Sequence, residues 1–213
     1  MSKITLVTGG VRSGKSTFAE SLFEDKDNVL YIATSLITDD EMKERVTIHK
    51  ASRNQNWETL ESYNDLYKAI RETECKYIML ECVTTLVSNM IFDKYTNFDN
   101  ISTEQKKELE NEIGMQIKKI ITTAMEFDKE LIMISNEVGS GLVSEYRLGR
   151  IFTDIAGRIN QLIGKLCDEA YLVVAGLPLK LKWFDNNIKK QYTKLWKLNI
   201  NLGAPKKVKR ECG

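Results

Sequence analysis

Several ingredients are scarce in this chain of 213 residues, and each scarcity excludes a class of protein. It has only two prolines and no repeat or low-complexity segment, which excludes a collagen-like or proline-rich chain. The longest apolar runs, such as Leu131–Ile134, are far shorter than the roughly 20 residues that span a bilayer. No basic segment followed by an apolar stretch opens the chain. We therefore expect neither a membrane span nor a secretory signal.

Cysteine and histidine are too few and too scattered for a zinc site. The four cysteines are Cys75, Cys82, Cys167 and Cys212, without C-x-x-C spacing, and His49 is the only histidine. Without a secretory signal, these thiols are expected to stay reduced. The sequence therefore predicts a cytoplasmic protein that has no disulfide framework.

Charge is nearly balanced overall but uneven along the chain. The net charge is +1, yet residues 180–213 carry a local charge of +8 and residues 1–179 a charge of −7. A composition of 42% hydrophobic and 29% charged residues is that of an ordinary globular protein. We expect one domain over residues 1–182 and a basic extension over 183–213. A chain so close to neutral is a poor candidate for binding nucleic acid.

Short apolar runs alternate with longer amphipathic stretches. The runs are typical of strands buried on both faces, and they are Ile4–Val7, Val29–Ile32, Tyr77–Leu80, Leu131–Ile134 and Tyr171–Val174. The segment 102–105 (STEQ) has capping-box spacing and opens a long helical pattern, while a similar start at Thr38 predicts a helix that reaches His49. The alternation predicts an α/β fold, in which helices cover a mostly parallel central sheet.

A glycine-rich segment directly follows the first predicted strand and precedes a helical run, Thr17–Phe23. It fits the P-loop pattern G-x-x-x-x-G-K-[ST] and consists of Gly9, Gly10, Val11, Arg12, Ser13, Gly14, Lys15 and Ser16. Glycines let the backbone curl so that several N–H groups point at one phosphate chain. Lys15 is expected to reach the β and γ phosphates, and the Ser16 hydroxyl to bind Mg²⁺. The segment predicts that the protein binds a nucleoside triphosphate.

Two further residues each have two interpretations on spacing alone. Glu81 follows the strand Tyr77–Leu80, where it either contacts Mg²⁺ or a nucleotide hydroxyl, or is a plain solvent-facing carboxylate. His49 lies four residues from both Arg45 and Arg53. These cations would keep its imidazole neutral and would bind phosphates. His49 suits an apolar helix stripe equally well, as a packing residue.

Six segments make the chain resemble the bifunctional adenosylcobinamide kinase/adenosylcobinamide-phosphate guanylyltransferase family of cobalamin biosynthesis. Beyond the P-loop, the motifs YIATS and NEVGSG are the most specific. The segments are Thr8–Ser16, Tyr31–Ser35, Asp39–His49, Leu80–Asn89, Ser135–Gly141 and Leu148–Gln161. The resemblance covers roughly residues 4–182 and implies a three-layer P-loop fold of the RecA-like type.

The resemblance also implies two reactions. ATP or GTP first phosphorylates the terminal hydroxyl of adenosylcobinamide. GTP then guanylylates His49 with release of pyrophosphate, and the GMP passes to adenosylcobinamide phosphate, giving adenosyl-GDP-cobinamide. His49 and Lys15 are thereby expected to be catalytic, with Mg²⁺ as the cofactor. A homo-oligomer, a trimer in the family, is also implied.

Further GTP contacts are implied outside the P-loop. They are Thr34, Ser35 and Leu36 after the second strand, Lys50, Ala51, Ser52 and Arg53 after the histidine, and the carboxylates Glu61 and Glu81. A second set of residues in the late segments has two interpretations. It lies either at a corrinoid pocket or subunit contact, or in a segment that caps and packs a helix. Its members are Asn136, Glu137, Arg158 and Asn160. The chain departs from the family at Ser144, where proline is usual, and at Gly149, placed mid-helix where alanine is commoner.

Three other functions stay open on the sequence. One is a guanylyltransferase without kinase activity, and another is a GTP-switched binding protein that is not an enzyme. The third is a P-loop nucleic-acid ATPase that uses the basic extension. For residues 183–213, however, the favoured interpretation is a solvated extension that packs partly against the acidic body.

Overall fold

The structure is a computed structural model, and it describes residues 2–35, 54–98 and 100–182. Its elements, in chain order, are β1 Lys3–Gly9, α1 Lys15–Ser21, β2 Val29–Ala33, β3 Glu58–Glu61, α3 Leu66–Glu72, β4 Tyr77–Glu81, α4 Val83–Lys94, α5 Thr103–Glu126, β5 Glu130–Asn136, α6 Arg147–Leu166, β6 Glu169–Val174 and β7 Leu177–Lys182. The predicted helix from Thr38 to His49, the contacts Leu36 and Lys50–Arg53, and the extension 183–213 lie outside the described residues.

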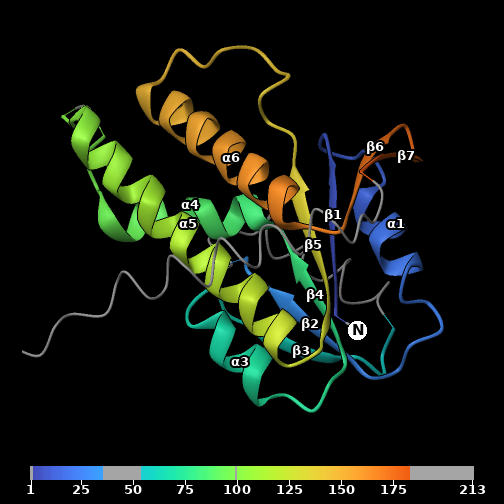
Figure 1. Ribbon diagram of the computed structural model, residues 1–213. Coiled ribbons are helices and arrows are strands. Elements are labelled where there is room, and N and C mark those ends of the chain that lie inside the picture. The colour runs from blue at the N-terminus through green and yellow to red at the C-terminus, as the bar shows by residue number, and fades with distance from the viewer. Residues whose placement is uncertain (1, 36–53, 99, 183–213) are drawn as a thin grey trace, which may run out of the picture. The chain divides into compact units, whose positions relative to one another are not determined.

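The strands form one seven-stranded sheet in the order β3-β2-β4-β5-β1-β6-β7. All neighbours are parallel except the hairpin of β6 and β7. Figure 1 shows α3, α4, α5 and α6 on one side of the sheet and α1 on the other. The predicted three-layer α/β fold with a mostly parallel sheet is confirmed, and β5 lies between the P-loop strand β1 and β4, which is the RecA-like strand order.

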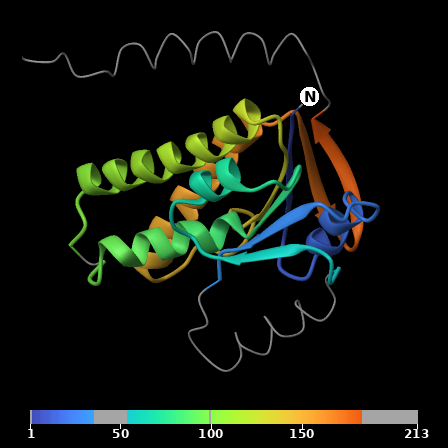
Figure 2. The same ribbon diagram turned by 90° about the horizontal axis from the view of Figure 1, so that it is seen from below.

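Apolar side chains cover both faces of the sheet, as the continuous apolar runs predicted. Ile4 and Leu6 of β1 join the larger core, which the four helices α3 to α6 share. Val7 faces the other way, into a smaller core with α1 and the buried Trp57. Figure 2 shows the same separation from a second direction, with the long helices grouped on one side of the strands.

The five predicted strands are all present, but the sequence did not predict the two edge strands. Edge strand β3 is mostly exposed, and only Leu60 of its four residues is partly buried, so it has no apolar run. In β7, Pro178 interrupts the pattern, and proline is tolerated at a sheet edge because no neighbour needs its missing N–H. Both strands thus lack the signal that marks a central strand.

The long helix α5 begins where the capping box predicted. Ser102 accepts a hydrogen bond at its Oγ from Gln105 N at 3.2 Å, while Ser102 N donates to Gln105 Oε1 at 2.8 Å. This reciprocal pair satisfies two backbone donors at the helix start. Within the part of the chain that the structure describes, no helix is both long and apolar enough to cross a membrane.

Candidate active site at the carboxyl edge of the sheet

The P-loop is a tightly packed turn between β1 and α1. Gly9 ends β1, and a Cβ there would lie 2.5 Å from the carbonyl oxygen of Val173. Gly14 has a φ of 90°, and its own Cβ would lie 3.0 Å from Gly176 Cα. Gly176 N also donates to Ser13 O at 2.8 Å. The two glycines are therefore needed because the β6–β7 turn supports the loop from behind.

Lys15 begins α1 and folds back over the loop. Its Nζ donates to Gly10 O at 3.2 Å. Burial lowers the pKa of Lys15, while its electrostatic interactions with Cys82 and Glu81 partly oppose that effect. A bound triphosphate would supply further negative charge and offer oxygens in place of the Gly10 carbonyl. The ammonium is thus already placed where phosphate would stabilise it.

The predicted residues outside the loop lie at the same edge. Ala33, the last residue of β2, pairs with Glu61 on one side and Glu81 on the other, and Thr34 and Ser35 follow it. The carboxyl edge of a parallel sheet is where ligands bind in open α/β folds. Glu61 is exposed and Glu81 half-buried, so both carboxylates are accessible there.

Thr34 has a structural role in addition to any contact with nucleotide. Its Oγ1 lies 2.8 Å from Glu81 O and 3.0 Å from Cys82 O, and its own carbonyl accepts a hydrogen bond from Asn89 Nδ2 at 2.8 Å. The side chain is 1% exposed. Thr34 therefore ties the end of β2 to the start of α4, and its buried hydroxyl donates to that connection.

A polar cluster lies at the ends of β4 and β5. Sequence reasoning named its members Asn136 and Asn160 without joining them to the nucleotide edge, and it missed Cys82 and Thr84. Cys82, with a φ of 66°, precedes α4, and Thr84 lies in the first turn of that helix. Asn136 Nδ2 donates to Thr84 Oγ1 at 3.0 Å, and Asn160 Nδ2 donates to Asn136 O at 3.1 Å. Because Cys82 and Asn136 end or follow predicted strands, their position alone could have indicated this edge.

The other two residues of the late segments lie in simple local contacts. Glu137 accepts a hydrogen bond at its carboxylate from Gly139 N at 2.8 Å, within its own loop. Arg158, on α6, forms a surface ion pair with Glu110 at 3.5 Å. These contacts give Glu137 and Arg158 structural roles, whereas Asn136 lies beside the P-loop.

The donors at the edge suit a magnesium ion that is bound chiefly by phosphate. The Ser16 hydroxyl and the Glu81 carboxylate are hard oxygen donors, the kind that Mg²⁺ prefers. Among the described residues there is no cluster of three or more His, Cys, Asp or Glu side chains that could hold a metal ion by itself. Mg²⁺ usually keeps few protein ligands and several waters or phosphate oxygens.

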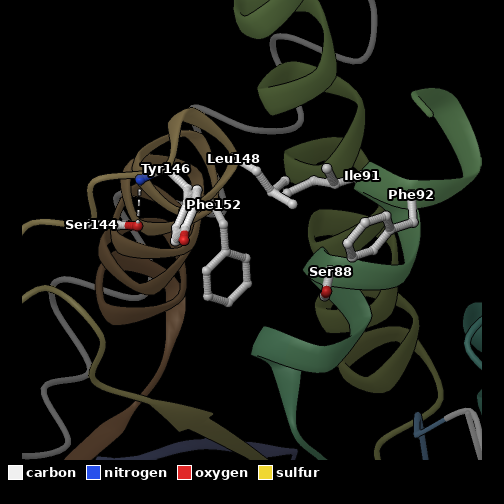
Figure 3. Close-up of a pocket in the computed structure, with 8 residues that line it drawn as sticks. Ser88, Ile91, Phe92, Ser144, Tyr146, Leu148 and Phe152 are labelled. Atoms are coloured by element: carbon white, nitrogen blue, oxygen red, sulfur yellow. Dashed lines mark hydrogen bonds between the residues drawn. The ribbon is translucent and has the colours of Figure 1, made fainter. Parts of the chain in front are cut away.

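A separate apolar pocket of about 350 Å³ lies between α4 and α6. Figure 3 shows Ser88, Ile91 and Phe92 of α4 on one side, with Leu148 and Phe152 of α6 on the other. Its remaining lining residues are Ser144, Tyr146 and Gly149. None of the predicted nucleotide-binding residues lines this pocket.

Comparisons with known proteins agree on one family. The family model described as cobinamide kinase / cobinamide phosphate guanyltransferase matches residues 5–181. The bifunctional adenosylcobalamin biosynthesis protein CobU of Escherichia coli K12 is 41% identical over 179 residues, which are 83% of this chain and 98% of that protein. The Salmonella typhimurium protein of the same name is 42% identical with the same coverage. The Pseudomonas aeruginosa protein CobP is 33% identical over 180 residues, 83% of this chain and 96% of that protein.

Among solved structures, a KaiC-like protein of Pyrococcus horikoshii OT3 is similar at a TM-score of 0.44 and 13% identity. The match covers 80% of this chain and 70% of that one. At this score the likeness is too low to support a conclusion about function.

Proposed function

Because the chain belongs to the family of cobinamide kinases / cobinamide phosphate guanyltransferases, we propose that it phosphorylates adenosylcobinamide and then transfers GMP from GTP to the new phosphate. The observation that carries this proposal is the P-loop, formed at a sheet edge that also presents Glu61 and Glu81. Its substrates are accordingly adenosylcobinamide, adenosylcobinamide phosphate and nucleoside triphosphates, with ATP or GTP in the first step.

In the kinase step, the acceptor hydroxyl oxygen forms a bond to the γ-phosphorus. The bond from that phosphorus to the bridging oxygen of the nucleoside diphosphate breaks, and the hydroxyl loses its proton. Such transfers depend on positioning and on neutralising charge rather than on covalent help from the protein. Lys15, moved from Gly10 O onto the phosphates, would supply that charge.

In the guanylyl step, an imidazole nitrogen of His49 forms a bond to the α-phosphorus of GTP and pyrophosphate leaves. A phosphate oxygen of adenosylcobinamide phosphate then displaces the histidine, which is regenerated. Dividing the transfer in this way replaces one encounter between two anions with two easier steps. His49 lies outside the described residues, so this role is supported by the motif DDEMKERVTIH at 39–49.

Mg²⁺ is the proposed cofactor of both steps, with Ser16 as the residue that would hold it. When bound, the ion neutralises charge on the phosphate oxygens. Among the proposed GTP contacts, Ser35 lies in the described part of the chain, whereas Leu36 and residues 50–53 do not. Glu61 and Glu81 would accept hydrogen bonds from guanine or ribose.

We also propose a cytoplasmic homo-oligomer, a trimer. The support for an oligomer is the β6–β7 hairpin, where Leu177, Leu179 and Leu181 are 55–73% exposed. The support for a reducing compartment is that Cys75, Cys82 and Cys167 are free thiols. Light scattering after size-exclusion chromatography measures the mass, and a monomer would contradict the trimer.

The guanylyl step is tested by incubating the protein and a His49→Ala variant with Mg²⁺ and α-³²P-labelled GTP before a denaturing gel. We expect an acid-labile, alkali-stable label on the wild type alone. Absence of label on a wild type that still binds GTP would remove the covalent mechanism and favour a GTP-switched binding protein.

The kinase step needs a separate assay, because a P-loop alone does not prove transfer to a hydroxyl. Transfer of the γ-phosphate to adenosylcobinamide is measured with labelled ATP and with labelled GTP. Phosphorylated product is expected from at least one of them. If guanylylation occurs without it, the protein is a guanylyltransferase only.

A further inference from the structure

Asn136 lies between the P-loop and the acidic end of β4. It is the last residue of β5, which stands between β1 and β4 in the sheet. In the β1–β5 pair, Asn136 is directly opposite Gly9, where the P-loop begins. On the other side, β4 ends at Glu81 and continues into Cys82. A group bound over the loop and reaching toward Glu81 would therefore pass Asn136.

The backbone at Asn136 is fixed from two directions. Its carbonyl accepts a hydrogen bond from Asn160 Nδ2 at 3.1 Å, and the next peptide N–H, that of Glu137, donates to Gly9 O at 2.9 Å. Asn160 is itself oriented, because its Oδ1 accepts a hydrogen bond from Ser135 Oγ at 2.6 Å. Ser135 is fully buried. The position of Asn136 relative to the P-loop is therefore set by both β1 and α6.

The side chain of Asn136 is held in one orientation and still has hydrogen-bonding capacity. Its Nδ2 donates to Thr84 Oγ1 at 3.0 Å, and Thr84 is only 3% exposed. The second contact of Nδ2, at 3.8 Å from Cys82 Sγ, is long and weak. An amide nitrogen carries two N–H donors, and this one has a single strong acceptor among the described residues. A ligand oxygen would be a stronger acceptor for the second N–H than the Cys82 sulfur is.

Lys15, at the start of α1, and Asn136, at the end of β5, both lie beside the first glycines of the P-loop. Lys15 Nζ donates to Gly10 O at 3.2 Å, and Asn136 is directly opposite the preceding residue, Gly9, in the β1–β5 pair. In P-loop proteins the lysine reaches the β and γ phosphates, which are acceptors only. A terminal phosphate held by Lys15 would therefore lie near the Asn136 side chain, where it could replace the weak sulfur contact.

We propose that Asn136 donates a hydrogen bond to the γ-phosphate of the bound triphosphate, and that Asn160 is the positioning residue that holds it there. The inference rests on the proposed function to the extent that the P-loop must bind a triphosphate. Asn136 thereby distinguishes nucleoside triphosphate from diphosphate and keeps the γ-phosphate in place for transfer.

The test compares affinities for GDP and for a GTP analogue that cannot be hydrolysed, with Mg²⁺ and without corrinoid. Asn136→Ala should weaken the analogue about tenfold or more and leave GDP within about twofold, because only the analogue carries the γ-phosphate. Asn136→Asp should weaken the analogue further, since a carboxylate repels phosphate. An equal change for both nucleotides, or no change, would overturn the inference.

Asn160→Ala, introduced into the wild type, should lower the ratio of the GTP-analogue affinity to the GDP affinity. In the Asn136→Ala background the same change should add little, because Asn160 acts through Asn136. A purely structural role would lower the melting temperature without changing the ratio. Asn111→Ala, at an exposed position on α5, is the matched control and should leave both affinities unchanged. Failure of the proposed function is distinguishable: the wild type would then not phosphorylate adenosylcobinamide, whereas the affinity ratio would still report on Asn136.

Discussion

At the scale of single residues, the Lys15 ammonium should raise the affinity for a phosphate ligand but lower the stability of the unliganded fold. Burial lowers its pKa, which means that the folded protein disfavours its charge. A phosphate chain reverses that balance. The same side chain is therefore expected to have opposite effects on stability and on affinity.

The prediction for Lys15→Met is that GTP affinity falls about 10- to 100-fold, the usual effect of losing a hydrogen bond to a charged group. The melting temperature should stay equal or rise, because a buried cation is removed. Calorimetric titration and thermal unfolding measure the two quantities. Lys107→Met, at an exposed position on α5, is the control. A variant that binds GTP as the wild type does would contradict the role of Lys15.

Cys167 predicts how stability depends on pH. It is 3% exposed at the end of α6, and burial raises the pKa of its thiol from 9.0 to about 11. Between these values the unfolded chain loses the thiol proton while the folded chain keeps it. Folding then takes up a proton, so stability falls as pH rises from about 9 to 11.

The loss attributable to this thiol is about 2–3 kcal/mol by pH 11, since each pKa unit corresponds to about 1.4 kcal/mol. The contribution of the thiol is measured by urea unfolding of the wild type and of Cys167→Ala at several pH values. The difference between the two proteins isolates this contribution, because all other titrating groups are common to both. The wild type should lose stability more steeply over this range. Parallel curves would show that the thiol does not contribute.

At the scale of elements, the start of α6 explains two departures from the family together. Gly149 lies in the first turn of α6 rather than mid-helix as expected, and its ideal Cβ would lie 2.3 Å from Ser144 Oγ and 2.6 Å from Ser144 Cβ. Ser144 Oγ accepts a hydrogen bond from Tyr146 N at 3.2 Å. The loop thus crosses the start of α6 so closely that, with Ser144 in the loop, only glycine fits at position 149 without a clash.

The corresponding prediction is a coupling between the two positions. Gly149→Ala should destabilise the protein by about 1 kcal/mol, because overpacking of about 1–3 kcal/mol exceeds the helix-propensity gain of about 1 kcal/mol. In a Ser144→Gly background the same change should be neutral or stabilising. Chemical denaturation of the four proteins gives the coupling energy, and strictly additive effects would argue against the contact.

At the scale of the whole molecule, the described core is complete before residue 183. Both apolar cores are built from residues between Ile4 and Val173, and Lys182 Nζ donates to the carbonyls of Gly164 and Cys167 at the end of α6. The relatives match 83% of this chain with 96–98% of their own length, so residues beyond about 182 have little counterpart in them.

We therefore predict that a chain truncated after Lys182 folds and binds GTP within about twofold of the full-length affinity. Circular dichroism melting and nucleotide titration of both chains measure this, with polynucleotide added in parallel. A large loss of stability would contradict the domain boundary. Nucleotide turnover that rises with DNA or RNA and falls on truncation would instead favour the nucleic-acid ATPase.

The sequence alone determined the features that depend on local chemistry. Continuous apolar runs predicted the central strands because both faces of a parallel sheet are buried, and Ser102 predicted the start of α5 because a capping box satisfies nearby donors. The P-loop was predictable for the same reason, since its glycines, Lys15 and Ser16 are contiguous.

Only the tertiary structure decided which distant residues meet. Strand order is set by packing across the sheet, so the sequence did not show that β5 separates β1 from β4, or that Asn136 faces Gly9. The exposed strand β3 and the proline-containing β7 pair at the edges because a neighbour offers them hydrogen bonds, not because of their own apolar pattern. The mutual fit of Ser144 and Gly149 likewise depends on how the loop crosses α6, which no local pattern records.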